Sequence, residues 1–443
     1  MLKKLLLAFI LFTFPTAFGQ TELVLDLNKC IELALEKSHD LKLAKLESEK
    51  ADEQITEAFG SSVLPDIKGT VDYRRGLKLG EIIIDIPGFS GSFPQGTENT
   101  LSVGVTVDQP LFTGAVFFAT RIANVYAEIS QKSYYATKAA LIRNVKRAYY
   151  SLLVSRQFLE LSNITLEAAK DNFKDAEAMY KAGLVPEYDY IRANVQVQNI
   201  LPELERAENS IVLAENGLKL VIGLDLEQQI EINDSLIFNK IDVENYENSK
   251  LILEEKNFTL QQLRLQIELM DKAASYQFSK HFPELYLFGS WSSIAQENDP
   301  RSFSDWRYKN SVYVGVNLKV PIFNGWQTTS KVDQAEIDLL KVQEEYHRTN
   351  KLLKNQLENV LLAIEEKLFQ IDAYSATIEQ AQLGYDIALK RYSSGIGTQL
   401  ENIDSLVELT RAKINYLDAV FEYYDLHALL EELLSTKVEV EVE

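Results

Sequence analysis

Apolar and small residues recur at coiled-coil spacing along much of the chain. From Leu141 to Tyr180 they follow one another at alternating intervals of four and three residues, which is the spacing of a coiled-coil seam. Every seventh position of this seam is Ala or Ser, which lets a neighbouring backbone approach closely; these positions are Ala148, Ser155, Ser162, Ala169 and Ala176. The pattern predicts long helices packed tightly side by side, and it is also typical of an ordinary bundle core.

The lengths of these stretches predict a helical wall. Residues 115–182 would form one helix of about 100 Å at about 1.5 Å per residue. The return segments 193–221 and 409–433 carry the same seam, so each long helix is expected to have an antiparallel partner. Residues 22–60 and 187–222 would span about 57 Å and about 54 Å. Stacked end to end, these two shorter helices have about the same length as the long helix beside them. This agreement predicts a cylinder wall of about 100 Å.

Four shorter segments alternate apolar and polar residues with the two-residue period of a β-strand. The segments are 65–75, 101–110, 284–293 and 311–321. Their length of about nine to eleven residues suits a tilted membrane strand, and all three tryptophans lie around the second pair, as in an aromatic belt at a membrane interface. A half-buried sheet of a soluble protein gives the same alternation. The intervening segments 76–100 and 294–310 are predicted to be exposed loops.

Two sequence landmarks occur twice, which indicates an internal duplication. A Pro-x-Phe-x-Gly motif follows the second strand of each pair, and a Tyr-x-x-Gly motif follows each long helix. Because proline has a fixed φ and no N–H, the first motif is expected at a junction from strand to helix. The second is expected at a tight turn between helices. The motif residues are Pro110 with Gly114, Pro321 with Gly325, Tyr180 with Gly183, and Tyr392 with Gly395.

The duplication divides the chain into two repeats that each run helix, two strands, very long helix, tight turn and helix. We predict a signal peptide at 1–19, a first structural repeat at 20–223, an equatorial linker at 224–249, and a second repeat with a C-terminal tail at 250–443. The repeats are domain-sized, because solenoid repeats have only about 20 to 50 residues.

The first nineteen residues have the parts of a cleaved secretory signal. Two lysines precede an apolar run from Leu5 to Phe14, and small residues stand before Gln20. Because this run is too short to cross a hydrocarbon core of about 30 Å, we expect cleavage and export. Later in the chain no run reaches about eighteen consecutive apolar residues, so no transmembrane helix is predicted.

Composition excludes several classes of function. The chain carries 65 Asp and Glu against 45 Lys and Arg, a formal net charge of −20. Nucleic acid is therefore excluded as a partner, because its binding needs clustered Lys and Arg. The single cysteine, Cys30, permits no intrachain disulfide and is predicted to be a small buried residue. With scattered histidines, few soft ligands and no catalytic or phosphate-binding motif, we expect no enzyme activity, no metal and no cofactor.

Four strands are too few to close a membrane barrel, because the smallest single-chain barrels need about eight. A barrel would therefore be shared between chains. The duplicated plan, the Pro-x-Phe-x-Gly strand exits and the Tyr-x-x-Gly turns resemble the TolC-like outer-membrane efflux protein family over essentially the whole mature chain. The resemblance implies a mainly α fold with a small β part. In such a fold, coiled-coil hairpins form an α-barrel, and four β-strands per chain contribute to a transmembrane β-barrel shared by a homotrimer.

The function implied by the resemblance is a passive exit duct of a tripartite efflux or type I secretion system. Its implied partners are a periplasmic adaptor, or membrane fusion protein, an inner-membrane RND or ABC transporter, and outer-membrane lipid. The implied location is the outer membrane of a Gram-negative bacterium, with a long periplasmic extension. The alternative is a soluble periplasmic coiled-coil scaffold or adaptor protein whose strands form an ordinary sheet.

Acidic residues cluster at the two tight turns. Asp189 lies six residues after Gly183, and Glu401 lies six residues after Gly395, so the duplication makes these acids equivalent. Asp404 follows Glu401 on the same helix face. Acids in the first turn of a helix also favour its positive dipole end, so a plain helix-capping role is the alternative.

The resemblance places these residues at the closed periplasmic end of the channel. Glu401 and Asp404 match acids that line the aperture. Asp189 and Tyr392 match a network that holds neighbouring helices shut.

One departure from the family pattern concerns this network. Some relatives carry an arginine second after the glycine of the turn, and here Val185 and Gly397 stand at those places. The sequence therefore does not predict a salt-bridge lock of that form.

Overall fold

The computed structural model describes residues 23–243, 245–298 and 302–436. The predicted signal peptide at 1–19 and the end of the C-terminal tail lie outside the described residues. The chain is mainly helical with a smaller β part, which confirms the predicted fold class at that level. Each repeat contains one very long helix, α3 (Gly114–Lys181) or α7 (Gln327–Ser393).

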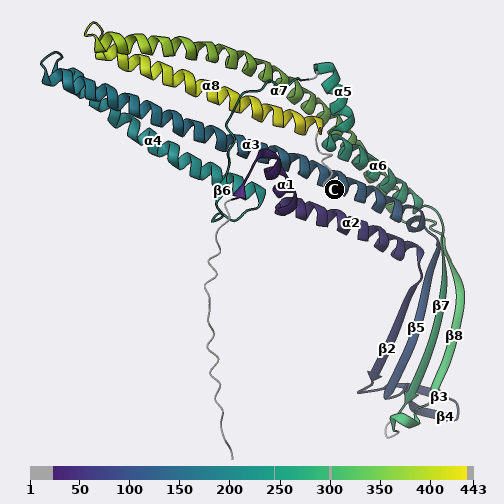
Figure 1. The fold of residues 1–443 in the computed structure, drawn as a ribbon. Coiled ribbons are helices and arrows are strands. Elements are labelled where there is room, and N and C mark those ends of the chain that lie inside the picture. The colour runs from purple at the N-terminus through teal and green to yellow at the C-terminus, as the bar shows by residue number, and fades with distance from the viewer. Residues whose placement is uncertain (1–22, 244, 299–301, 437–443) are drawn as a thin grey trace, which may run out of the picture. The chain divides into compact units, whose positions relative to one another are not determined.

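The chain divides into two compact units, and both long helices pass from one unit into the other (Figure 1). The helical unit comprises the described residues of Met1–His39, Ala140–Val243 and Asn359–Glu432, and the sheet unit comprises the described residues of Asp40–Ala139, Glu244–Glu358 and Leu433–Glu443. Each unit therefore takes parts of both sequence repeats.

The helical unit contains two antiparallel helix pairs. In the first, α4 (Glu187–Ile222) returns along α3, and in the second, α8 (Gln399–Leu434) returns along α7 (Figure 1). The first pair shares a buried apolar cluster of Leu166, Ala169, Val197 and Ile200. These residues belong to the seams seen in the sequence, so the apolar stripe is what joins the two helices.

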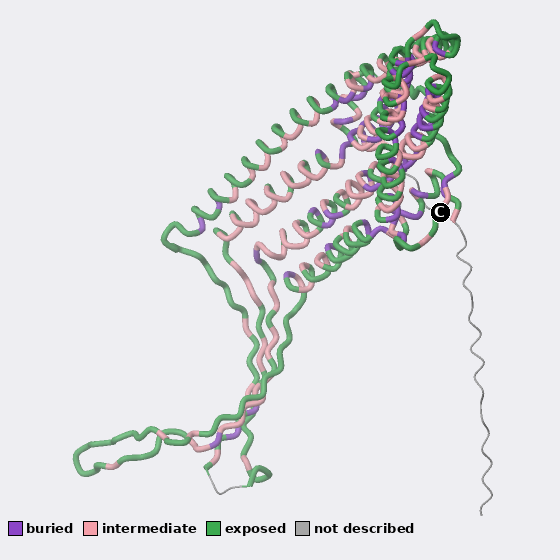
Figure 2. Tube along the Cα trace, turned by 90° about the vertical axis from the view of Figure 1, so that its left-hand side faces the viewer, coloured by how far each residue is buried: buried purple, intermediate pink, exposed green. Residues whose placement is uncertain are grey.

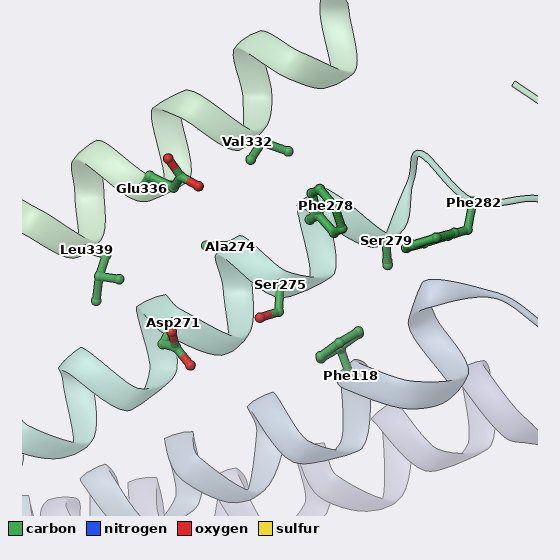
Figure 3. A pocket seen from close by; sticks show the side chains of 10 residues that line it. All are labelled: Phe118, Asp271, Ala274, Ser275, Phe278, Ser279, Phe282, Val332, Glu336 and Leu339. Atoms are coloured by element: carbon green, nitrogen blue, oxygen red, sulfur yellow. The ribbon is translucent and has the colours of Figure 1, made fainter. Parts of the chain in front are cut away.

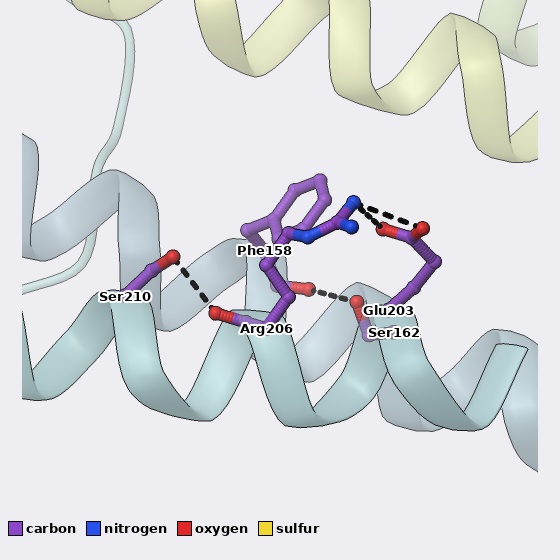
Figure 4. A network of polar contacts seen from close by, with 5 residues as sticks. All are labelled: Phe158, Ser162, Glu203, Arg206 and Ser210. Carbon is purple, nitrogen blue, oxygen red and sulfur yellow. Dashed lines mark hydrogen bonds and ion pairs between the residues drawn. The ribbon is translucent and has the colours of Figure 1, made fainter.

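The small seam residue Ser162 of α3 is buried with its hydroxyl hydrogen-bonded. Ser162 is buried, and its hydroxyl donates to the Phe158 carbonyl one turn earlier at 2.9 Å (Figure 4). On α4 nearby, Arg206 and Glu203 form an exposed ion pair at 2.8 Å. At this level of the helix pair, the charged groups lie at the surface and the seam hydroxyl is bonded within its own helix.

Residues 22–60, predicted as one helix, contain two. They are α1 (Leu27–Lys37) and α2 (His39–Val63). Ser38 separates them with a non-helical backbone, at φ −54° and ψ 127°. The break lies where Lys37 packs against Gly223 at the end of α4, and a Cβ at Gly223 would lie 2.9 Å from the Lys37 Cβ. This close approach, which the sequence pattern does not reveal, accompanies the interruption.

The predicted linker at 224–249 is partly held against α8. Strand β6 (Ile230–Glu231) pairs in parallel with β1 (Leu23–Val24). Beyond it, the Tyr424 hydroxyl accepts a hydrogen bond from the Asn239 N–H at 2.9 Å, and the Tyr423 hydroxyl accepts one from the Ile241 N–H at 2.8 Å. Side chains of α8 therefore satisfy the backbone of a segment that has no regular structure.

The sheet unit is built on a four-stranded antiparallel sheet with the order β2-β5-β7-β8. Its elements are β2 (Asp66–Arg75), β5 (Asn99–Phe112), β7 (Glu284–Glu297), β8 (Tyr308–Lys319), α5 (Tyr246–Lys256), α6 (Phe258–Ser279) and a short 3-10 turn η1 (Phe303–Asp305), with α2 and the first parts of α3 and α7. Each of the four alternating sequence segments contains one strand of this sheet. Strands β5, β7 and β8 extend beyond the segments into stretches predicted as loops.

The segment 76–100, predicted to be an exposed loop, contains a second antiparallel strand pair. Strands β3 (Gly80–Ile86) and β4 (Phe89–Gln95) pair along their whole length. Gly88 in the connecting turn has φ 92°, a conformation that glycine adopts readily in tight turns. The segment is exposed but regular, because isoleucines at alternate positions favour a strand over an open loop.

Buried residues lie mainly in the helices, whereas the β3–β4 hairpin is almost entirely exposed in the single chain (Figure 2). On β8 the apolar residues Val312, Val314 and Val316 share one face and are all exposed. Among the described residues, none of the helices combines the length and the apolar character of a membrane-crossing segment.

Candidate functional site

The two helical turns share one backbone geometry. Gly183 and Gly395 each have φ 73°, a left-handed conformation that residues with a Cβ rarely adopt. Each glycine N–H donates to the carbonyl of its motif tyrosine, Tyr180 or Tyr392, at 2.9 Å. A Cβ at either glycine would meet open space. The backbone conformation, rather than crowding, therefore requires glycine here.

The helices that follow the turns begin differently. Helix α4 begins after Pro186, which provides no side-chain cap. Helix α8 begins with a capping box: the Thr398 hydroxyl accepts a hydrogen bond from the Glu401 N–H at 3.2 Å, and the Glu401 carboxylate accepts one from the Thr398 N–H at 3.4 Å. Glu401 also lies 3.8 Å from Arg391 and is exposed. This acid therefore caps a helix and still presents charge to solvent.

Asp189 and Tyr392 lie close enough to influence each other. Tyr392 is only 2% exposed, and its hydroxyl has no hydrogen-bond partner in the described part of the chain. Burial, followed by the negative charges of Asp189 and Asp175, raises the pKa of Tyr392 above its ordinary value of 10.0. Asp189 lies in the first turn of α4 and is half-exposed. The fold thus brings together one residue of each helix pair.

The sequence reasoning missed a buried polar cluster at the start of α8. Gln399 and Asn402 are fully buried, and Asn402 Nδ2 donates to Oδ1 of buried Asn172 on α3 at 2.9 Å. Both amide atoms of Gln399 are without a hydrogen-bond partner among the described residues. A signal was available in the seam. Counting back from Leu409 in steps of three and four reaches Leu406, Asn402 and Gln399, which are core positions.

The remaining candidate groups offer little for catalysis. Asp404 is exposed on α8, on the same side as Glu401 by its spacing. In the described ranges, no group of three or more His, Cys, Asp and Glu is placed to hold a metal ion. Cys30 is buried, and burial raises its pKa to about 12, so it stays a neutral thiol. What the turns do offer is a set of exposed carboxylates beside buried, incompletely bonded polar groups.

A sequence model described as outer membrane efflux protein matches residues 30–224 and 252–435, which include both long helices, both turns and most of the strands. The chain belongs to the outer membrane efflux protein family. The resemblance inferred from the duplicated motifs is thereby confirmed. As an outer-membrane efflux protein, the chain provides an exit duct from the cell envelope and is not an enzyme.

Individual relatives of this efflux protein are distant but cover most of it. It is 22% identical to the outer membrane protein TolC of Vibrio cholerae over 73% of this chain and 74% of TolC. It is 20% identical to the alkaline protease secretion protein AprF of Pseudomonas aeruginosa over 87% of this chain and 81% of AprF. The crystal structure of the CmeC outer membrane channel of Campylobacter jejuni matches it with a TM-score of 0.78 at 18% identity, covering 92% of this chain and 85% of CmeC. The predicted outer-membrane location and long periplasmic helical part agree with these relatives.

This efflux protein has Gly397 at the position where some relatives carry an arginine. A Cβ at Gly397 would lie 3.0 Å from the Arg391 Cβ and 3.0 Å from the Tyr392 nitrogen, so a larger residue has no room. Near this turn, an Arg391 guanidinium nitrogen lies 3.8 Å from a carboxylate oxygen of Glu401 in the same helix pair.

The two strand-to-helix junctions of the efflux protein use glycine for different reasons. Gly114 begins α3 so close to α6 that a Cβ would collide with the Ser279 hydroxyl. Gly325 instead has φ 66° with open space around it. Pro110 lies within β5 at a shift in register, whereas Pro321 follows the end of β8.

The sheet unit of the efflux protein also contains an open groove of about 500 Å³ between α3, α6 and α7 (Figure 3). Its walls carry aromatic and aliphatic side chains and two carboxylates; the lining residues are Phe118, Asp271, Ala274, Ser275, Phe278, Ser279, Phe282, Val332, Glu336 and Leu339. The groove lies among helices of one protomer, and none of the residues predicted to form the aperture lines it.

Proposed function

We propose that three copies of this efflux protein form one passive exit duct, with β2, β5, β7 and β8 of each copy joined in a shared barrel in the outer membrane. The observation that carries the proposal is the open sheet. Strands β2 and β8 are its edges, and no described strand pairs with their outer sides. Lipid cannot hydrogen-bond such edges. Pairing β2 of one copy with β8 of the next closes the barrel and satisfies both.

The exposed apolar side chains of β8 also support a shared barrel in the membrane. Val312, Val314 and Val316 of β8 are exposed in the single chain, although water disfavours a row of β-branched apolar residues. Contact with lipid acyl chains gives this face an apolar surrounding. The length of the strands is also sufficient to cross the hydrocarbon layer at a tilt.

We further propose that the helical turns form the periplasmic end of the duct. Three copies of Glu401 and Asp404 then surround one opening, and their summed field favours cations over anions. Asp189 of one helix pair and Tyr392 of the other lie near each other at this end, and we expect them to belong to the network that holds the helices shut. No cofactor is needed, because the duct only conducts.

The proposed partners supply energy and cargo. They are a periplasmic adaptor protein and an inner-membrane transporter of the RND or ABC type, as in tripartite efflux or type I secretion. The relatives support this class through their names, which include a protease secretion protein.

The decisive experiment is the mass of the protein extracted from membranes in mild detergent. We expect a trimer that stays with the membrane during a carbonate wash. A monomeric mass would contradict the shared barrel, and release by carbonate would favour a soluble periplasmic scaffold. Pull-down from crosslinked cells tests the partners separately.

A further inference from the structure

One face of the β3–β4 hairpin is apolar except for Gln95 at its open end. Its register pairs Ile82 with Phe93 and Ile86 with Phe89, with Ile84 between the two isoleucines. Residues paired across antiparallel strands share a face, so these five side chains lie together. They are between 39% and 58% exposed. The described residues of the protomer therefore leave this face largely uncovered.

The opposite face of the hairpin is mostly polar. It carries Glu81, Ile83 and Asp85 from β3 and serines from β4. The Ser92 hydroxyl donates to the Glu81 carboxylate at 2.6 Å. The hairpin is thus amphipathic, with its charged groups confined to one side.

The apolar face is ordered by its own aromatic residues. The Phe89 and Phe93 rings stack with their centroids 5.9 Å apart, and a Cβ at Gly91 would lie 3.2 Å from the Phe93 ring. Glycine at this position lets both rings lie flat over the strand. Because an isolated two-stranded hairpin is marginal in water, this face needs an apolar cover.

The position of the hairpin indicates what that cover is. Four residues separate the hairpin from Arg75, the last residue of β2. At this end of the strand the Tyr73 ring stacks on the Trp306 ring with centroids 6.5 Å apart, and the Trp306 and Phe303 ring centroids are 5.1 Å apart. Such aromatic groups are typical of the level at which a membrane meets water. In both views the hairpin turns aside from the strands and runs across the end of the sheet (Figure 1, Figure 2).

We propose that the β3–β4 hairpin lies flat on the outer membrane, with its apolar face inserted among lipid acyl chains and its acidic face in water. An amphipathic element at this level binds in the plane of the interface. Lipid is the occupant favoured here, because the aromatic cluster of Tyr73, Trp306 and Phe303 lies at the end of the sheet from which the chain enters the hairpin. The inference rests on the proposed placement of the sheet in the membrane.

The test uses an environment-sensitive NBD label on single introduced cysteines. The native Cys30 is buried with a raised pKa, so it does not react, and the unsubstituted protein serves as the labelling blank. Ile84→Cys reports the apolar face, and Ile83→Cys is the matched control on the other face. The full-length protein is reconstituted into phosphatidylcholine vesicles with plain or brominated acyl chains. We expect a blue shift and lipid quenching at position 84, and quenching by aqueous iodide at position 83.

Two other results at position 84 would overturn the proposal. Quenching by iodide alone means that the face is wet, and resistance to both quenchers means that protein, such as a second copy, covers it. Val314→Cys on β8 separates this failure from that of the proposed function. Lipid quenching at 314 without quenching at 84 rejects the hairpin inference alone, whereas lipid quenching at neither position also rejects the placement of the sheet.

Discussion

The turn between α3 and α4 and the turn between α7 and α8 share a backbone but differ in how well their polar groups are satisfied. At the first, Tyr180 is 39% exposed and stacks on Tyr190 with ring centroids 5.5 Å apart. At the second, the equivalent Tyr392 is buried and its hydroxyl has no partner among the described residues. Duplication has preserved the geometry that glycine sets, while the surroundings have diverged.

The difference locates the less stable of the two turns. The second turn adds the unpaired amide of Gln399 to the hydroxyl of Tyr392, and a buried unpaired polar group costs about 1–3 kcal/mol. The capping box of Thr398 and Glu401 offsets part of this cost. We therefore expect substitutions that remove an unpaired polar group to stabilise the α7–α8 turn more than the α3–α4 turn.

The largest expected effect follows from removing the unpaired amide. Gln399→Leu keeps a side chain of similar size and should stabilise the protein by about 1–3 kcal/mol, measured as a rise in the thermal unfolding midpoint. The control is Glu187→Leu at the equivalent exposed position of α4, which should change stability by less than about 0.5 kcal/mol. Destabilisation by Gln399→Leu would mean that the amide is satisfied in the assembled protein.

The shared backbone predicts equal costs at the two glycines. Gly183→Ala and Gly395→Ala should each destabilise by about 1–2 kcal/mol, because both force a Cβ into a left-handed conformation. Denaturant titrations of the two variants compare them directly. A clear inequality would show that the turns differ in conformation as well as in surroundings.

The tyrosines provide a comparison that depends on pH. Tyr392→Phe should raise stability by about 1 kcal/mol at neutral pH because it removes an unpaired hydroxyl, whereas Tyr180→Phe should be nearly neutral. The raised pKa of Tyr392 means that the folded protein retains a proton that the unfolded chain loses near 10.0. This titration therefore leaves the free energy of unfolding unchanged below pH 10 and lowers it as the pH rises further. Stability measured on either side of pH 10 should fall more in the parent than in Tyr392→Phe.

The smallest effect on stability concerns the exposed acids. Glu401→Gln combined with Asp404→Asn should cost about 0.3–1 kcal/mol and weaken cation preference, read as the reversal potential of single channels in a salt gradient. The control is Glu408→Gln, which removes an exposed acid of α8 that is paired with Arg411 at 2.9 Å. If the pair of substitutions lowers stability without altering the reversal potential, both acids are only helix caps.

The long helices and their turns could be predicted from the sequence, because helical spacing and turn motifs each depend on residues close together in the chain. Seam spacing predicted the long helices, and Tyr-x-x-Gly predicted their turns, where a positive φ leaves little choice but glycine. The interruption at Ser38 was missed, since it accompanies the contact of Lys37 with Gly223. That contact joins residues far apart in the chain, and no local pattern encodes it.

The β3–β4 hairpin and the buried amides of α8 were missed because their residue types are more typical of loops and surfaces. Glycines and prolines suggested a loop at 76–100, yet alternate isoleucines face phenylalanines across the turn at Gly88. At the candidate site, Asn402 and Gln399 occupy core positions, but polar residue types do not mark an apolar seam. The roles of Asp189, Tyr392, Glu401 and Asp404 in closing or lining a duct remain predictions, because they depend on how copies meet.

The unpaired edges of β2 and β8 also affect how a newly exported chain associates with other copies before assembly is complete. A strand edge accepts any extended segment that reaches it, and joining copies through two different edges gives either a closed ring or an open-ended chain of subunits. Ring closure competes with continued addition, and the balance depends on how fast new copies arrive. If copies join through β2 and β8 as proposed, slow export favours closed rings and overproduction favours open-ended aggregates. The yield of functional channel is then expected to pass through a maximum as expression rises.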